Sequence, residues 1–274
     1  MAATSVARTA TDPTATDALV TDDHDDGCEP EEAEETDPSS RQVDLAMART
    51  ILENGEIELA ARMPYSSNAT FLVHVEHEDI TAAAVYKPVR GERPLWDFPA
   101  GLHRREIAAF ELSDELGWDV IPPTVERDGP HGQGSVQLFI DADFEQHHFT
   151  LVKHREYHED LRKLCVFDLL ANNTDRKSGH CLLSSWGRIY GIDHGLCFSE
   201  HWKLRTVIWD FTGEPIEENL LADVEEFVDD GLERLAPWLD GPELEAVEDR
   251  ARQVLADGVY PDDESGHRWP WPLV

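Results

Sequence analysis

The hydrophobic pattern changes character part-way along the chain. Up to about residue 141, most apolar residues lie in short segments bounded by turn-forming residues, as in β-strands. After it they lie in longer segments spaced as in α-helices. A sheet followed by helices folds as packed layers or lobes, and ligand sites favour the cleft between such parts. The pattern predicts an α+β fold with two lobes, a β-rich N-lobe and a mainly helical C-lobe, and a cleft between them.

The N-lobe is expected at residues 41–141. Strands at 70–77 and 80–88 are joined by so short a link that a hairpin is expected. A polar loop, 64–69, separates them from a strand at 56–63. The other elements expected in this lobe are a helix at 43–54, a helix at 103–117, and two strands on either side of a turn at 128–134.

The C-lobe is expected at residues 142–274. A strong apolar stripe predicts a helix over 158–173, and a polar loop follows it up to residue 180. Two short strands on either side of a turn at Trp186 and Gly187 come next. Two acidic amphipathic helices, 217–236 and 242–256, are expected near the end of the sequence.

The acidic balance of the chain restricts its partners. It has 57 acidic and 23 basic residues, for a net charge of −34. Such a charge repels nucleic acid and anionic lipid surfaces at long range, so neither nucleic-acid binding nor stable membrane association is expected. Residues 1–40 hold twelve acidic residues against one arginine and almost no large apolar residue, which predicts a disordered acidic tail.

Two absences from the sequence bear on location. No run approaches the ~18 consecutive apolar residues of a transmembrane helix. The first twenty residues lack a basic region followed by an apolar one, so no secretory signal is expected. We therefore expect a cytoplasmic protein, and its cysteines to be reduced and mostly buried.

Three segments, in a fixed order, carry residues suited to phosphoryl transfer. That chemistry needs a cation on the phosphates, carboxylates that hold Mg²⁺, and a group that orients the acceptor. Lys87 ends a strand of small apolar residues, as the phosphate-binding lysine of kinases does. Glu106, nineteen residues later on the next predicted helix, is the expected ion-pair partner of this lysine, with Glu111 as the alternative.

The second segment is the loop Asn172–His180, with the sequence NNTDRKSGH. Asp175, Arg176 and a polar residue five positions after the aspartate resemble the catalytic loop DRHxxN of the phosphatidylinositol 3/4-kinase-like group. The resemblance implies that Asp175 orients or deprotonates the acceptor. His180 stands where that group has its metal-binding asparagine, and histidine is a softer ligand than oxygen for Mg²⁺. Asn172 or Asn173 is the alternative ligand.

The third segment is IYGIDHG, which is similar to the metal-binding motif of kinases and contains Asp193. Eighteen residues separate Asp175 from Asp193, enough for a loop and a hairpin that brings both carboxylates to the same end. Together the three motifs resemble the bacterial phosphatidylinositol 3/4-kinase-like proteins found widely in actinobacteria. The resemblance covers roughly residues 45–240 and implies a protein-kinase-like fold with a nucleotide cleft.

The resemblance also implies further site residues. The loop between the first two strands would cover the phosphates of ATP through Ser66, Ser67 and Asn68. Gln137 and Phe139, with their neighbours Leu138 and Ile140, would line the adenine. The expected metal ligands are Asp193, His180 and Asn173.

The function expected on these grounds is an ATP- and Mg²⁺-dependent phosphotransferase that acts on an unidentified hydroxyl acceptor, either a protein or a small molecule. Its catalytic residues would be Asp175, Lys87 and Glu106. Two alternatives remain open. The chain could be a nucleotide-binding pseudokinase or regulatory module without turnover, which His180 favours, or it could transfer AMP in place of phosphate.

Overall fold

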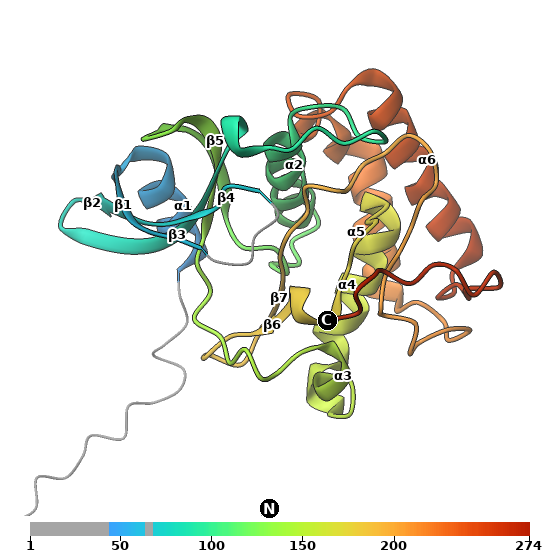
Figure 1. Ribbon diagram of the computed structural model, residues 1–274. Helices are drawn as coiled ribbons and strands as arrows, with labels where there is room; N and C mark the ends of the chain where they lie inside the picture. The colour runs from blue at the N-terminus through green and yellow to red at the C-terminus, as the bar shows by residue number, and fades with distance from the viewer. Residues whose placement is uncertain (1–43, 64–67) are drawn as a thin grey trace, which may run out of the picture. The chain divides into compact units, whose positions relative to one another are not determined.

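The structure is a computed structural model that describes residues 44–63 and 68–274 (Figure 1). The predicted tail at 1–40 lies outside the described residues. The strands are β1 (Glu56–Arg62), β2 (Phe71–His77), β3 (Ile80–Pro88), β4 (Thr124–Gly129), β5 (Gly132–Leu138), β6 (Cys181–Leu183) and β7 (Ile189–Gly191). The helices are α1 (Leu45–Asn54), α2 (Leu102–Glu115), α3 (His148–Leu151), α4 (His158–Ala171), α5 (Glu218–Glu226) and α6 (Gly241–Asp257). A sheet followed by helices confirms the predicted α+β class.

The first five strands form one antiparallel sheet in the order β1-β2-β3-β5-β4. The predicted hairpin of β2 and β3 is present. The turn between β4 and β5 is shorter than the predicted 128–134, because Gly129 pairs with Gly132 and only two residues lie between them. Gly132 has a φ of +93°, a conformation that glycine adopts without strain, and this permits so tight a turn.

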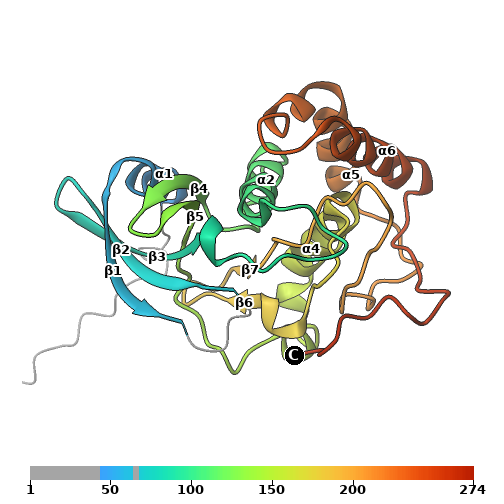
Figure 2. The ribbon, with the colours of Figure 1, turned by 45° about the horizontal axis from the view of Figure 1, so that its top comes forward.

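One face of the sheet is buried beneath α1 (Figure 2). Alternate residues of β3, Ala84 and Tyr86, point to this face and pack with Ile51 and Leu52 of α1. Lys87 therefore points to the opposite face, which α2 approaches at β4 and β5. The period-two alternation of β3 thus decides that Lys87 faces α2.

A larger buried cluster surrounds α4 in the helical part of the chain. Its members include Leu164 and Phe167 of α4, both fully buried, and Val247 of α6. The cluster also takes in Ala108 and Leu112 of α2, although α2 precedes two strands of the sheet in the sequence. Because burial does not divide at residue 141, the predicted domain boundary there stays a prediction.

The short hairpin of β6 and β7 lies between the two buried clusters. Leu182 and Tyr190 pack with the sheet, whereas Cys181 and Ile189 pack with the helices. Gly191 allows this close fit, since a Cβ there would lie 2.8 Å from a methyl carbon of Leu164. The hairpin thus holds His180, which precedes β6, and Asp193, which follows β7, at the junction of the two clusters.

The predicted helix at 217–236 is shorter in the structure. α5 ends at Glu226, and the chain continues to Arg234 through a widened turn and a tight one. At Gly231 a Cβ would lie 2.7 Å from Cγ of Glu115 on α2. Glycine weakens a helix, and here close packing against α2 requires it, so the regular helix stops before this residue.

Three cysteines, Cys165, Cys181 and Cys197, are buried and free of disulfides, in line with the sequence prediction. None of the helices in the described part of the chain combines the length and the apolar composition needed to cross a membrane.

Candidate active site

Lys87, near the end of the central strand β3, joins three elements. Its ammonium donates to Oε1 of Glu106 on α2 and, at 2.9 Å, to Oδ1 of Asp193 after β7. The second oxygen of Glu106, Oε2, accepts a hydrogen bond of 3.0 Å from the backbone N–H of His194. The structure therefore brings together the three charged side chains that the sequence singled out in the sheet, in the following helix and in the third motif.

The backbone around Lys87 is tightly packed. Lys87 pairs with Ser135 of β5, and a Cβ on the neighbouring Gly134 would lie 2.4 Å from the Lys87 carbonyl oxygen. Only glycine fits there, so β5 lies close against the strand end that carries Lys87.

A second contact fixes the helix that carries Glu106. The Glu92 carboxylate, in the loop before α2, accepts hydrogen bonds of 2.9 Å from the N–H groups of Gly101 and His103. These are free donors at the start of α2, so Glu92 caps the helix from outside it. Although burial opposes it, these bonds and the His103 ring lower the pKa of Glu92 to about 2. The cap stays ionised and holds α2 in register with Lys87.

The charges of the cluster stabilise one another. Burial alone would lower the pKa of the Lys87 ammonium, but the carboxylates of Asp193 and Glu106 outweigh it and raise that pKa. The Lys87 ammonium in turn lowers the pKa of the Asp193 carboxyl, against the opposing effect of burial. The Glu106 side chain is 4% exposed and that of Asp193 is 53% exposed, so the cluster is closed on the side of α2 and open at Asp193.

Asp193 has a φ of +64°, in the left-handed region that few residues other than glycine, asparagine and aspartate adopt. This conformation turns the chain sharply after β7. Asp193 Oδ1 binds Lys87, and Oδ2 lies 3.7 Å from Nε2 of His180. One carboxylate therefore contacts both the strand lysine and the loop histidine.

His180 is anchored to the loop that precedes it. Its Nδ1 lies 2.9 Å from the backbone carbonyl oxygen of Asp175. Burial lowers the pKa of the His180 ring, although the Asp193 carboxylate opposes this effect. Burial therefore favours the neutral form of the ring, which connects the Asp175 loop to Asp193.

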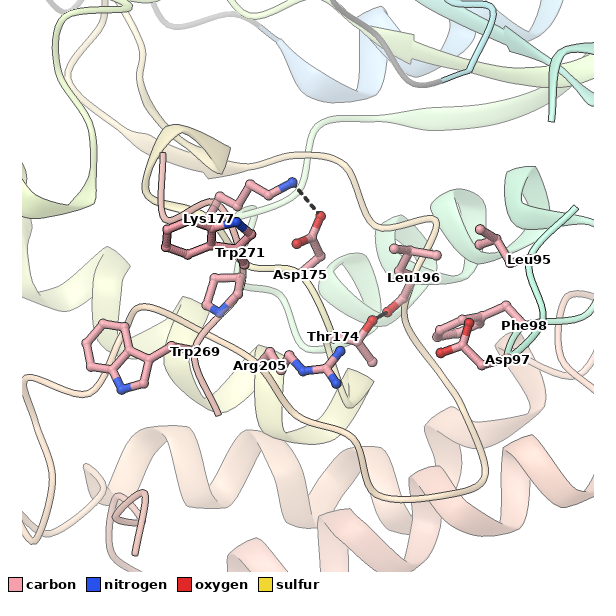
Figure 3. A pocket seen from close by; sticks show the side chains of 11 residues that line it. Leu95, Asp97, Phe98, Thr174, Asp175, Lys177, Leu196, Arg205, Trp269 and Trp271 are labelled. Carbon is pink, nitrogen blue, oxygen red and sulfur yellow. Dashed lines mark hydrogen bonds and ion pairs between the residues drawn. The ribbon is translucent and has the colours of Figure 1, made fainter. Parts of the chain in front are cut away.

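The Asp175 carboxylate is partly exposed. Its Oδ2 accepts a hydrogen bond of 2.8 Å from the ammonium of Lys177, and its backbone N–H donates to Asn173 Oδ1 at 3.0 Å. The carboxylate lines a pocket of about 300 Å³ (Figure 3). The other walls come from segment 95–98, from Leu196 and Arg205, and from segment 269–271 with its tryptophans Trp269 and Trp271.

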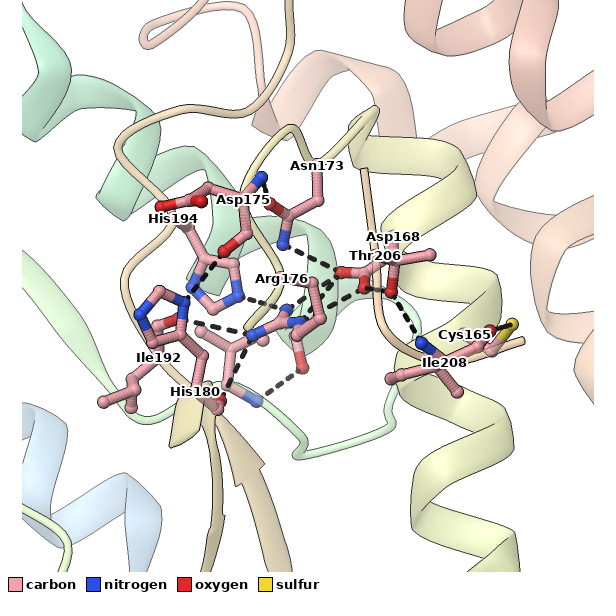
Figure 4. A network of polar contacts seen from close by, with 12 residues as sticks. Cys165, Asp168, Asn173, Asp175, Arg176, His180, Ile192, His194, Thr206 and Ile208 are labelled. Carbon is pink, nitrogen blue, oxygen red and sulfur yellow. Dashed lines mark hydrogen bonds and ion pairs between the residues drawn. The ribbon is translucent and has the colours of Figure 1, made fainter. Parts of the chain in front are cut away.

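A fully buried ion pair supports the loop Asn172–His180 (Figure 4). Arg176 donates to the Asp168 carboxylate of α4 at 2.9 Å, and neither side chain is exposed. Asp168 also accepts bonds from Asn173 Nδ2 at 2.9 Å and from the Thr206 hydroxyl at 3.0 Å. Arg176 further contacts Nε2 of His194 at 2.7 Å. This network fixes the loop next to Asp175 on one side and the segment after Asp193 on the other.

Asn173 does not join the metal ligands expected with it. Both polar atoms of its side chain are engaged: Nδ2 donates to Asp168 of α4, and Oδ1 accepts from the Asp175 N–H. The alternative, Asn172, follows the last residue of α4 as its C-cap, and its side-chain amide donates to the carbonyl oxygens of Ser199 and His201. Each asparagine thus contributes to loop structure, and Asp193 and His180 are the two expected ligands that meet.

The other residues that were predicted to contact the nucleotide lie in three parts of the chain: residues 66–67, Asn68, and the stretch 137–139. Ser66 and Ser67 lie outside the described residues. The Asn68 side chain accepts a bond of 3.1 Å from the Arg93 N–H, next to the sheet. Gln137 pairs with Val85, so it shares the face of Lys87, but it is buried and bonds Thr124 at 2.8 Å. Phe139 is half-buried, and its N–H bonds the Ala83 carbonyl at 2.9 Å.

The potential metal ligands at Asp193 fit a divalent ion that takes most of its other ligands from phosphate oxygens and water. Within the described residues, no three acidic, histidine or cysteine side chains converge as a metal cage. Asp193 and His180 offer one carboxylate oxygen and one imidazole nitrogen 3.7 Å apart. Mg²⁺ in nucleotide sites uses one or two protein ligands together with phosphate oxygens and water. The residues present therefore suit such an ion and would bind it through Asp193 and His180.

Three supporting residues escaped prediction from the sequence. Asp168 had a visible signal, an acidic residue inside the apolar stripe of a helix, which marks a buried partner for a cation. Lys177 lies two residues from Asp175, so its contact is local and could have been proposed. Glu92 had no signal, because its role depends on how the loop folds back onto α2.

Residues 120–219, which hold Asp175, His180 and Asp193, match the family model described as "Phosphatidylinositol 3- and 4-kinase". The chain is 38% identical over 261 residues to "Protein Rv2133c" of Mycobacterium tuberculosis, a match that covers 81% of this chain and 94% of the relative.

Two solved structures are also similar to this chain. A Fam20 protein from hydra, solved with sugar, is 15% identical with a TM-score of 0.48, covering 80% of this chain and 88% of that one. The Helicobacter pylori proinflammatory kinase CtkA is 12% identical with a TM-score of 0.45, covering 75% and 93%.

The family match and the ordered motifs define a kinase-like domain. The chain belongs to the bacterial phosphatidylinositol 3- and 4-kinase-like family, which confirms the resemblance drawn from its motifs.

Proposed function

We propose that this protein is an ATP-dependent phosphotransferase that moves the γ-phosphoryl group to a hydroxyl acceptor. One observation carries the proposal. Lys87 from the sheet, Glu106 from α2 and Asp193 after β7 meet through direct ion pairs, and His180 links Asp193 to the loop of Asp175. These are the charged groups that phosphoryl transfer requires, drawn from four separate segments.

On the nucleotide side, Lys87 would bind the α- and β-phosphates. Glu106 keeps the ammonium in place, and because Glu106 also accepts from the His194 N–H, it sets Lys87 relative to the Asp193 segment. A Mg²⁺ ion bound at Asp193 and His180 would neutralise charge on the phosphate oxygens. Ser66, Ser67 and Asn68, in the segment before β2, are proposed to contact the phosphates. Gln137 and Phe139 are proposed to contact the adenine.

On the acceptor side, Asp175 would take the proton. The acceptor oxygen bonds to the γ-phosphorus, the bond from that phosphorus to the β,γ-bridging oxygen breaks, ADP leaves with the electron pair, and the acceptor proton passes to the Asp175 carboxylate. The Lys177 ammonium, 2.8 Å from Oδ2, holds the carboxylate in a fixed orientation.

The acceptor would enter through the pocket beside Asp175. A volume of about 300 Å³ suits a small molecule or one side chain of a protein. Trp269 and Trp271 offer flat apolar walls, and Arg205 offers a cation. The net charge of −34 disfavours anionic membranes and nucleic acid as partners, so we rank a protein or small-molecule acceptor ahead of them.

The test is to compare the wild type with Asp175→Asn. Radiolabelled ATP with Mg²⁺ or Mn²⁺ reports phosphate transfer to the protein itself, to candidate acceptors or to water. A thermal shift reports nucleotide binding without turnover. We expect Asp175→Asn to lose about 10²- to 10⁴-fold in rate, the usual share of a positioned acid–base group, while it keeps its nucleotide-dependent shift.

Two other outcomes would replace the proposal. A wild type that binds ATP but transfers nothing in either metal would identify a pseudokinase, the alternative that His180 favours. Mass spectrometry that finds added AMP in place of added phosphate would identify a nucleotide transferase.

A further inference from the structure

The His180 ring has a defined hydrogen-bonding state. Its Nδ1 lies 2.9 Å from the Asp175 carbonyl oxygen, which can only accept, so Nδ1 carries the hydrogen. The competing approach of the Lys177 N–H to the same nitrogen is longer, at 3.5 Å. In the neutral ring Nε2 is then the atom with the free electron pair.

The free electron pair of His180 Nε2 lies near a second potential metal ligand, the Asp193 carboxylate. Nε2 of His180 lies 3.7 Å from Oδ2 of Asp193. Metal–ligand bonds to nitrogen and oxygen are about 2.1 Å long, so one ion can bind two atoms up to ~4.2 Å apart. The gap between the two side chains therefore suits a single cation, and the other Asp193 oxygen is held by Lys87 at 2.9 Å.

The hairpin fixes this spacing. The Ile192 N–H donates to the His180 carbonyl oxygen at 3.1 Å, and Arg176 Nη1 donates to the same oxygen at 3.3 Å. His180 and Asp193 thus flank paired strands, β6 and β7, with the buried guanidinium beneath them. The two ligand atoms are preorganised, which favours metal binding over a chance contact.

We infer that His180 Nε2 and Asp193 together bind the metal ion that accompanies the nucleotide, and that this site prefers Mn²⁺ to Mg²⁺. The inference rests on the proposed nucleotide site. Mg²⁺ is a hard ion that favours oxygen ligands, whereas imidazole binds transition metals more readily. Mn²⁺ is the transition ion that also accepts the octahedral, oxygen-rich surroundings that phosphates and water supply.

The experiment detects the nitrogen directly. The full chain is loaded with Mn²⁺ and a non-hydrolysable ATP analogue, and electron spin-echo envelope modulation records nuclei bonded to the ion. We expect a ¹⁴N coupling in the wild type that changes to a ¹⁵N coupling when the histidines are ¹⁵N-labelled. This readout needs neither turnover nor a variant.

The matched variant is His180→Asn, which restores the residue type expected from the motif, with the exposed His154→Asn as control. In His180→Asn the ¹⁴N coupling should vanish, and the ratio of Mn²⁺ to Mg²⁺ affinity should fall by about tenfold or more, the scale on which metal-site partners act. His154→Asn should change neither. Circular dichroism and melting establish that each variant is folded.

The outcomes separate this inference from the proposed function. A Mn²⁺–nucleotide complex of the wild type without nitrogen coupling, or an unchanged metal ratio in a folded His180→Asn, overturns the histidine ligand but leaves the phosphotransferase intact. A wild type that binds no nucleotide with either ion overturns both.

Discussion

Two ion-pair clusters in this molecule, one at Arg176 and one at Lys87, differ in how completely their charges are enclosed. Arg176 and Asp168 are fully buried, and all the partners of Asp168 belong to the chain's own loops. In the Lys87 cluster, Glu106 is buried but Asp193 is half exposed. The charges of the Arg176 cluster are all paired within the protein. In the Lys87 cluster, the carboxylate of Asp193 remains accessible to a ligand.

This difference in exposure predicts which ion pairs mainly stabilise the fold and which mainly serve function. A buried charge that loses its partner is costly because water cannot replace it, while an open cluster exchanges one partner for another at little cost. Variants of the first cluster should therefore lose more stability than variants of the second, whose main loss should be in turnover.

The largest expected effect is that of Asp168→Ala. It leaves the Arg176 charge buried without its carboxylate, so the free energy of unfolding should fall by about 3–5 kcal/mol. Urea unfolding measures this. Arg252→Ala, which removes an exposed pair with Glu248 on α6, is the control and should leave the free energy of unfolding almost unchanged, because water replaces the partner of an exposed charge. Equal losses in the two variants would contradict the contrast between enclosed and open pairs.

Lys87→Met tests the open cluster. Loss of a preorganised cation on the phosphates should reduce turnover about 10²- to 10³-fold, as for other electrostatic groups in active sites. Lys163→Met, which removes only a surface pair with Glu159, should keep full turnover. Rates from ADP release, together with melting temperatures, distinguish the two variants. A Lys87→Met protein with normal turnover would remove Lys87 from the site.

A smaller effect is expected at the cap that holds α2. The lowered pKa of Glu92, about 2 against an ordinary 4.5, means that the folded state favours its ionised form. The stability that Glu92 contributes is thus present above pH 4.5 and is lost as the pH falls toward 2. Glu92→Gln should lose about 1 kcal/mol at pH 7, as expected for a lost cap.

Unfolding curves across this pH range measure the effect of Glu92. The difference between wild type and Glu92→Gln should narrow as the medium becomes acidic. A difference that stayed constant down to pH 2 would show that the Glu92 charge plays no part in holding the helix.

The smallest effect concerns Arg205, which is exposed and lines the pocket of Trp269 and Trp271. An unshielded guanidinium attracts anions, so iodide should quench tryptophan emission more in the wild type than in Arg205→Gln, by about twofold or less, because exposed charges interact weakly. Neutral acrylamide should quench both proteins equally. A change in acrylamide quenching would instead report a rearranged pocket.

The sequence predicted most elements because their signals are local. The small apolar residues of β3, the glycines of the β4–β5 turn and the stripe of α4 all act within a few residues. The order of Lys87, Asp175 and Asp193 was readable for the same reason, since each lies in a recognisable motif. The Lys87–Glu106 pair was predictable because a strand and the next helix carry it.

What the sequence could not supply is the set of contacts made across the fold. Whether Asn173 faces a metal or Asp168 depends on where α4 lies relative to the loop. The Glu92 cap joins a loop to the start of α2, and Trp269 and Trp271 form a wall of a pocket whose other residues lie far away in the sequence. No repeating pattern in the sequence indicates either contact. Such contacts follow from packing, which no local pattern encodes.

The membership of α2 in the helical cluster has a practical consequence for protein engineering. Chimeras between relatives are usually cut where sequence patterns change, which here would place α2 with the sheet. Yet Ala108 and Leu112 are buried among the helices, and Arg105 of the same helix binds Glu243 of α6. A functional hybrid should therefore inherit α2 and α6 from one parent, so that the exchanged part consists of two pieces, one on each side of α2.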